Sequence, residues 1–277
     1  MSVWEKLTSL PREVVMGLVI IAMLIPALSP LGLPLMTGQM SQDWYDTIEA
    51  LPEGSVILFD IGYGSGGYPS LGPGTIAAFH QIFENDLKLV IMATALEGTL
   101  MYPLVMAAVQ PESNYGAVYG EDYVFIGYIA GTQTAMAGVL GDLHELVTND
   151  YQGNPISGMP LMDNVGGADD FAIVAYVTTS GDVAEGWVYQ AYSQYNRDVL
   201  GGTLSMMTTS IKPYYDSGQL LGIMDGVKGA ADLEFLTGHP GDAIVSSDIL
   251  TFTQTLVLIF IAVGNISWFM QKQEGSG

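Results

Sequence analysis

The residues most able to do chemistry lie where an apolar run meets a glycine-rich loop. Residues 56–59 are apolar, and Asp60 follows them near the end of a predicted buried strand. A charge at that position must be paired or must lie at the edge of a sheet. Asp60 is therefore a ligand-binding carboxylate, one arm of a cation site, or a cap that accepts hydrogen bonds from loop amides.

The loop that follows reads GYGSGG over residues 62–67 and matches the G-x-G-x-x-G pattern of dinucleotide-binding proteins. The pattern works because glycines let the start of a helix approach a pyrophosphate. Here the next predicted helix begins only at Gly74, and the second predicted strand is followed by Thr94 rather than an acid. We therefore expect a flexible loop more than a dinucleotide site. Its candidate ligand contacts are Gly64, Ser65 and Gly66.

Other polar residues follow the next two predicted strands. Thr94 and Glu97 come after the second strand, and Thr132 and Gln133 come after the third. Ligands of open α/β sheets bind at the carboxyl edge of the strands, so these residues form a candidate rim around Asp60. The rim predicts a small polar ligand or a cation, with ordinary helix capping by hydroxyl side chains as the alternative.

Several kinds of chemistry find no support. The chain has no cysteine, which excludes disulfides and thiolate catalysis, and no two of its three histidines have metal-ligand spacing. A G-x-S-x-G elbow is also absent from the sequence. We therefore predict no metal, no cofactor and no catalytic residues, and a membrane-tethered hydrolase or transferase is the least favoured alternative.

Apolar runs and helical patterns alternate along the middle of the chain. Parallel strands joined by helical crossovers produce this pattern, so we expect a three-layer α/β domain with a mostly parallel sheet. Strands are predicted at residues 55–61, 87–93, 123–128, 171–177 and 203–208, and residues 220–224 are either a sixth short strand or the buried face of a helix. Helices are predicted at residues 74–85, 97–109, 132–147, 183–195, 211–217 and 227–236.

Two uncharged apolar stretches flank this domain. Val14–Met36 and Ile249–Met270 carry no ionisable side chain, and each is long enough to cross the roughly 30 Å hydrocarbon core as a helix. The expected organisation is thus a tail and span over residues 1–36, an acidic domain over 37–248, and a span with a short tail over 249–277. The predicted interfacial aromatic residues are Trp4, Trp44, Tyr45, Trp268 and Phe269.

Charge is distributed unevenly between these parts. Residues 37–248 contain 26 acidic and four basic side chains, so the domain should repel nucleic acid and anionic lipid. Lys6, Arg12 and Lys272 lie close to the spans on their terminal sides, which places both termini in the cytoplasm and the domain outside. The alternative for the first stretch is a cleaved signal peptide, but no A-x-A site follows it.

Two groups of residues predict self-association. Tyr189, Tyr192 and Tyr195 recur at every third position of a predicted helix, although such a stripe is also typical of a half-buried helix face. Gln254 and Asn265 lie eleven residues apart in the second span, which puts both amides on one face. The expected function is therefore a membrane-anchored homo-oligomeric scaffold, with ligand binding at the rim as the alternative.

Several blocks of sequence carry a family resemblance. They are residues 119–128, 131–136, 213–219, 228–234 and 260–266. In order and spacing these blocks resemble a family of uncharacterised two-span membrane proteins from archaea and some bacteria. The resemblance implies two spans around an α/β domain of the Rossmann or flavodoxin kind. It implies no activity and no catalytic residue.

Overall fold

The structure is a computed structural model that describes residues 11–28 and 36–274. The chain divides into two compact units. The first, Met36–Ala243, is called the α/β domain below. The second, called the terminal unit, contains helix α2 (Arg12–Leu28) and helix α12 (Asp242–Glu274) from Ile244 onward.

The α/β domain is built on a six-stranded sheet in which every pair of neighbours is parallel. The strand order is β3-β2-β1-β4-β5-β6. The chain adds β2 and β3 on one side of β1, then crosses back and adds β4, β5 and β6 on the other side, so the strand order reverses between the neighbours β1 and β4. The strands are β1 (Val56–Gly62), β2 (Lys88–Ala93), β3 (Tyr123–Tyr128), β4 (Ile173–Thr178), β5 (Asp198–Thr203) and β6 (Gly222–Asp225). The predicted α/β class and parallel sheet are confirmed.

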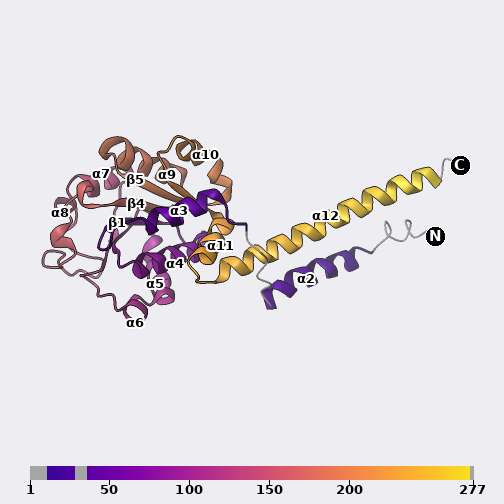
Figure 1. Cartoon of the computed structure of the whole chain (residues 1–277), viewed down its shortest axis with the longest axis horizontal. Helices are drawn as coiled ribbons and strands as arrows, with labels where there is room; N and C mark the ends of the chain where they lie inside the picture. The colour runs from indigo at the N-terminus through magenta and orange to yellow at the C-terminus, as the bar shows by residue number, and fades with distance from the viewer. Residues whose placement is uncertain (1–10, 29–35, 275–277) are drawn as a thin grey trace. The chain divides into compact units, whose positions relative to one another are not determined.

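Helices cover both faces of the sheet and make three layers (Figure 1). One face carries α3 (Gln39–Glu49), α4 (Tyr68–Glu84), α5 (Gly98–Val109) and α11 (Gly226–Leu236). The other carries α7 (Gln133–Gly141), α8 (Leu143–Leu146), α9 (Gly181–Trp187), the π-helix η3 (Val188–Gln194) and α10 (Ser205–Asp216). The short helices α6 (Pro111–Tyr115), η1 (Met162–Asn164) and η2 (Ala168–Asp170) lie in the connections.

Strand alternation decides what Asp60 faces. Ile57, Phe59 and Ile61 point to one face of the sheet, while Leu58 and Asp60 point to the other, because successive side chains of a strand alternate. Leu58 belongs to the core cluster that includes residues of α7, α9 and η3. Asp60 therefore projects into the layer beneath α9 and not into solvent.

Two predicted elements are wrong in position. The fifth strand was predicted at residues 203–208 but is Asp198–Thr203. Residues 205–208 belong to α10. The sequence did not predict a strand here because Gly201 and Gly202 lie in it and glycines are unusual inside strands. They are required by packing: a Cβ on Gly201 would lie 2.6 Å from the Tyr176 hydroxyl oxygen. The predicted helix over 132–147 is broken at Asp142, whose carboxylate caps α8.

Helix α3 was not predicted. Trp44 was expected at the membrane interface, but it is fully buried in α3 against β6. The backbone of α3 passes so close to the sheet that a Cβ on Gly222 would lie 2.4 Å from the Trp44 backbone nitrogen. The missing side chain at Gly222 is therefore what lets α3 dock there.

Within the described residues, α12 is the one helix that is long and apolar enough to cross a membrane. Its 33 residues correspond to about 50 Å of α-helix, against roughly 30 Å of hydrocarbon. Helix α2 has 17 described residues, about 26 Å of α-helix, which is shorter than the hydrocarbon core. A first span over Val14–Met36 is therefore not supported. Residues 29–35 of that stretch, and Trp4, lie outside the described residues.

Candidate functional site

The ends of β1, β2 and β4 meet at the point where the strand order reverses, and Asp60 lies at this switch point. Its carboxylate is fully buried and accepts three hydrogen bonds. The backbone nitrogen and hydroxyl of Thr94 donate at 2.8 and 2.7 Å, and the indole Nε1 of Trp187 donates at 2.7 Å. Asp60 therefore joins β1, β2 and α9 from inside the protein.

Burial raises the pKa of Asp60 to about 6, while the hydrogen bonds from Trp187 and Thr94 act in the opposite direction. Both carboxylate oxygens have donors, and none of the side chain is exposed. In this conformation Asp60 cannot touch a ligand at the sheet edge. The contacts match the capping alternative, in which the carboxylate satisfies loop and side-chain donors.

The glycine-rich loop lies differently from its prediction. Helix α4 begins at Tyr68, directly after Gly67, so the prediction that it begins at Gly74 is wrong. Gly62 thus ends β1, and Gly64 and Gly67 lie between it and the start of α4, as in dinucleotide-binding domains. The strand order is also the one found in those domains.

The space beside this loop is occupied. A Cβ on Gly64 would lie 1.6 Å from an Oε atom of Glu97, so the Glu97 side chain lies directly against the loop. A carboxylate there repels a phosphate group, which opposes the field of the helix start. The strand order and the glycine loop suit a dinucleotide, but the negative charge of Glu97 beside Gly64 does not suit its phosphate groups.

The remaining rim candidates differ in access. Ser65, Gly66, Glu97 and Gln133 are exposed, and Thr132 is half-buried. Thr132 precedes α7 with a φ of 44°, a backbone region that is uncommon for threonine. Gly64 and Thr94 are buried with Asp60. The rim therefore separates into an internal cluster of Asp60, Gly64 and Thr94 and an exposed part, called the exposed lip below, that consists of Ser65, Gly66, Glu97 and Gln133.

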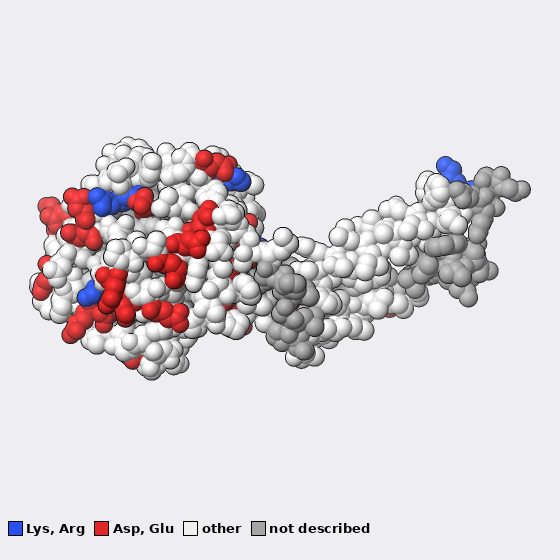
Figure 2. Space-filling view, viewed as in Figure 1, with Lys and Arg blue, Asp and Glu red and all other residues white. Residues whose placement is uncertain are grey.

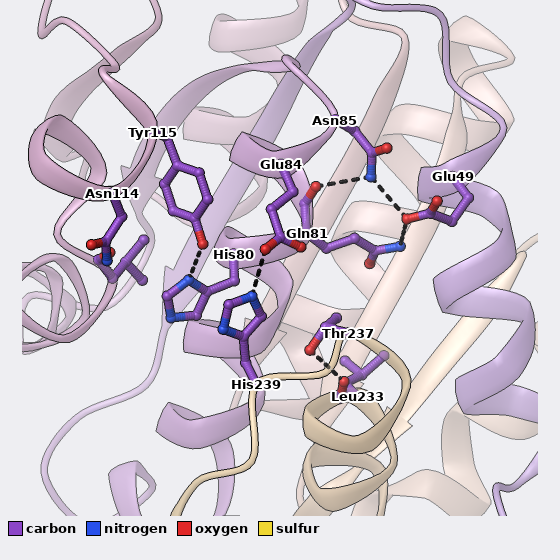
Figure 3. A network of polar contacts seen from close by, with 11 residues as sticks. Glu49, His80, Gln81, Glu84, Asn85, Asn114, Tyr115, Leu233, Thr237 and His239 are labelled. Atoms are coloured by element: carbon purple, nitrogen blue, oxygen red, sulfur yellow. Dashed lines mark hydrogen bonds and ion pairs between the residues drawn. The ribbon is translucent and has the colours of Figure 1, made fainter.

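Sequence reasoning missed a second polar cluster, which Figure 3 shows on α4 and the segment after α11. The imidazoles of His80 and His239 stack with ring centroids 4.0 Å apart and planes within 7°. The Nδ1 of His80 shares a hydrogen bond of 2.5 Å with the Tyr115 hydroxyl. The Nε2 of His239 lies 2.7 Å from a Glu84 carboxylate oxygen. The only sequence signal was the i, i+4 spacing of His80 and Glu84, because His239 is 159 residues beyond His80.

Burial, and then His239, lower the pKa of His80 to about 4, while Glu84 acts in the opposite direction. Burial and Glu84 raise the pKa of Tyr115 to about 12. His80 is therefore neutral and Tyr115 protonated near pH 7. A neutral His80 ring stacks on its neighbour without the repulsion that two imidazolium ions would feel at this distance.

This cluster borders a pocket of about 350 Å³ in the α/β domain. The wall combines apolar residues such as Pro73 and Ile76 with polar ones such as Tyr68 and Asp242. Two parallel imidazoles cannot direct lone pairs at one ion, because each lone pair lies in the plane of its own ring. Among the described residues, no group of three or more His, Asp or Glu side chains could hold a metal ion.

The predicted self-association residues fall into two sets. Tyr189 and Tyr192 belong to η3, and Tyr195 follows it. Tyr189 and Tyr195 are exposed, whereas Tyr192 is partly buried against the core cluster, so the three do not form a uniform outer stripe.

Gln254 and Asn265 of α12 are both exposed within the terminal unit. The residues of α12 that face α2 include Thr255 and Ile259, which line an apolar groove with α2 residues such as Ile21. Gln254 is about 140° round the helix from Ile259, and Asn265 is about 20° from Gln254. The two amides thus share a face that is turned away from α2.

No protein-family model, curated protein or solved structure matches this chain. The resemblance to a two-span membrane family gains no support from these comparisons.

Proposed function

We propose that this chain is a membrane-anchored protein that self-associates into a homo-oligomeric scaffold through α12. In this proposal two spans anchor the protein, both termini lie in the cytoplasm, and the acidic α/β domain lies outside. The partners are the lipid bilayer and further copies of the same chain.

The observation that carries the proposal is the exposed position, on one face of α12, of Gln254 and Asn265, the two amide side chains of the uncharged stretch Ile249–Met270. Amide groups in hydrocarbon are stabilised by hydrogen bonds to a neighbouring helix. Helix α2 occupies a different side of α12, so it does not provide those partners. The same face of α12 in a second copy of the chain would provide hydrogen-bond partners for both amides.

The charge of the α/β domain favours a location in water over one in lipid. Figure 2 shows acidic side chains over the visible face of the domain and few basic ones, as expected from 26 acidic and four basic residues. Lys6, Arg12 and Lys272 are the basic residues near the proposed spans, and all three lie on their terminal sides.

Native mass spectrometry of the full chain in a mild detergent tests the proposal. The wild type should give a discrete multiple of 29.6 kDa. Replacing both amides, as Gln254→Leu with Asn265→Leu, should weaken association by about tenfold or more, since interhelical hydrogen bonds contribute about 0.6–2 kcal/mol each and two are lost. Thr255→Leu, on the face toward α2, is the matched control and should leave the mass unchanged. An unchanged oligomer in the double variant would contradict the proposal.

A second candidate function is the binding of a small polar ligand at the exposed lip of the rim. It is favoured by the switch point in the strand order and by the exposure of Ser65 and Gly66 beside it. If the lip binds a cation through Glu97, then Glu97→Gln should abolish a copurifying adduct in the same mass spectra. A wild type without any adduct would count against this candidate.

A further inference from the structure

Helix α5 has an unusual outer face. Gly98–Val109 contains no charged residue, although the sequence around it is strongly acidic. Its inner face packs Met101, Val105 and Val109 into the domain. Its outer face is also apolar: Leu100 and Leu104 are 65% and 49% exposed, and Pro103, Ala107 and Ala108 are exposed beside them.

A helix that is apolar on all sides is normally buried. Leu96, just before the helix and 66% exposed, extends the same face by one turn because residues 96, 100 and 104 are spaced by four. Contiguous apolar patches on soluble surfaces commonly mark interaction sites. We call Leu96, Leu100, Pro103, Leu104, Ala107 and Ala108 the α5 patch, and its composition indicates that something covers it.

We propose that the α5 patch is covered by the α5 patch of a second copy of the chain. This inference rests on the proposed homo-oligomer and adds a contact in the α/β domain to the one in α12. Two domains with the same large negative charge approach at the lowest electrostatic cost where charge is sparse, and the α5 patch has no charged residue of its own, with Glu97 and Glu112 only at its ends.

The residues of the patch suit a helix against its own copy. Ala107 and Ala108 add little bulk, so two α5 helices can approach closely there. A symmetric pair brings the same patch of both copies together, and residues near the two-fold axis meet their own counterparts. Leu104 lies near the middle of the patch and is the best candidate for such a meeting.

A lipid surface is the competing occupant, and the chemistry of α5 disfavours it. Helices that lie on membranes have Lys or Arg on their polar face and Trp, Phe or Leu on the other, so the leucines of α5 alone do not exclude a lipid surface. Helix α5 has no basic residue, its aromatic residue Tyr102 is buried, and Glu97 and Glu112 flank it. An anionic bilayer would repel those carboxylates.

Membrane anchoring makes a small patch sufficient. Copies held by α12 in one bilayer meet at a high effective concentration, so the patch need not bind strongly in free solution. Salt should strengthen the contact, because it screens the repulsion between the acidic domains while leaving an apolar contact intact.

The absence of cysteine allows a clean test, since one introduced thiol is the only one present. Leu104→Cys is made in the full chain, reconstituted in lipid vesicles and treated with a short bis-maleimide. The matched control is Met206→Cys, at an 81% exposed apolar residue of α10 on the other face of the sheet. We expect Leu104→Cys to form a covalent dimer at least tenfold faster than Met206→Cys, and faster still at 1 M than at 0.1 M NaCl.

Equal rates for the two variants would overturn the inference. So would a thiol at position 104 that reacts with lipid-side reagents but not with a water-soluble maleimide, since the bilayer would then be the occupant. The variant with Gln254→Leu and Asn265→Leu reports on α12 separately, by its mass in mild detergent. Dimers through position 104 together with an unchanged oligomer in that variant would leave the α5 contact standing and remove the support for the α12 contact.

Discussion

The indole of Trp187 donates a hydrogen bond of 2.7 Å to the carboxylate of Asp60, which lies 127 residues earlier in the chain. The contact connects α9 to the end of β1 beneath the switch point. Together with the two hydrogen bonds from Thr94, this bond holds the Asp60 carboxylate inside the protein, where it connects three elements of the fold. Its consequences are measurable as stability.

Trp187→Phe should destabilise the α/β domain by at least about 1–3 kcal/mol, because a buried acceptor loses a donor and the smaller ring leaves part of the buried indole site empty. Urea unfolding followed by circular dichroism measures the change. Tyr189→Phe, at an exposed site two residues away, is the control and should shift stability by less than about 0.5 kcal/mol. Equal stability in Trp187→Phe and wild type would show that the indole bond contributes nothing.

Asp60 should make the protein more stable as the pH falls. Its folded pKa of about 6 lies above the ordinary value of 3.8, so between these values the folded state binds a proton that the unfolded state does not. Stability attributable to Asp60 therefore rises by roughly 3 kcal/mol as the pH falls from 7 to 4. The measurement is the free energy of unfolding of wild type minus that of Asp60→Asn across this range. A difference that stays constant with pH sinks the prediction.

His80 should act in the opposite direction. Its folded pKa of about 4 lies below the ordinary 6.5, so the unfolded state binds the extra proton in that window. Stability attributable to His80 is present above pH 6.5 and is lost as the pH falls toward 4, by roughly 3 kcal/mol.

His80→Gln removes this loss and keeps a partner for the Tyr115 hydroxyl, so the variant should gain stability relative to wild type as the pH is lowered. Between pH 4 and 6 the slopes of Asp60 and His80 oppose each other in the wild type. A His80→Gln curve parallel to that of wild type would mean that the ring titrates normally.

Gly222→Ala should destabilise the domain by about 1–3 kcal/mol or more, because the new Cβ would meet backbone atoms of Trp44 that cannot yield unless α3 moves. Gly66→Ala is the control: a Cβ there meets nothing within 4 Å, and its effect should stay within about 0.5 kcal/mol. Thermal unfolding of both variants compares them. Similar melting temperatures would show that α3 docks with more freedom than its contacts imply.

The regular parts of the fold were predictable because their signals are local. The apolar run before Asp60 and the runs at 87–93, 123–128 and 171–177 identify four buried strands, and helices between them require a parallel sheet. The uncharged stretch after Ile249 likewise identifies α12. The fifth strand and helix α3 were not predictable, because Gly201, Gly202 and Gly222 are dictated by neighbours that lie far away in sequence.

The candidate site divides in the same way. Sequence alone placed Asp60, Thr94 and the glycine loop at one edge of the sheet, since strand ends are read from hydrophobicity. Only the tertiary structure decided that Trp187 closes over Asp60, that Glu97 lies against Gly64, and that His239 stacks on His80. Each of these contacts joins segments from separate elements, and periodicity along the chain contains no information about which side chains meet across the fold.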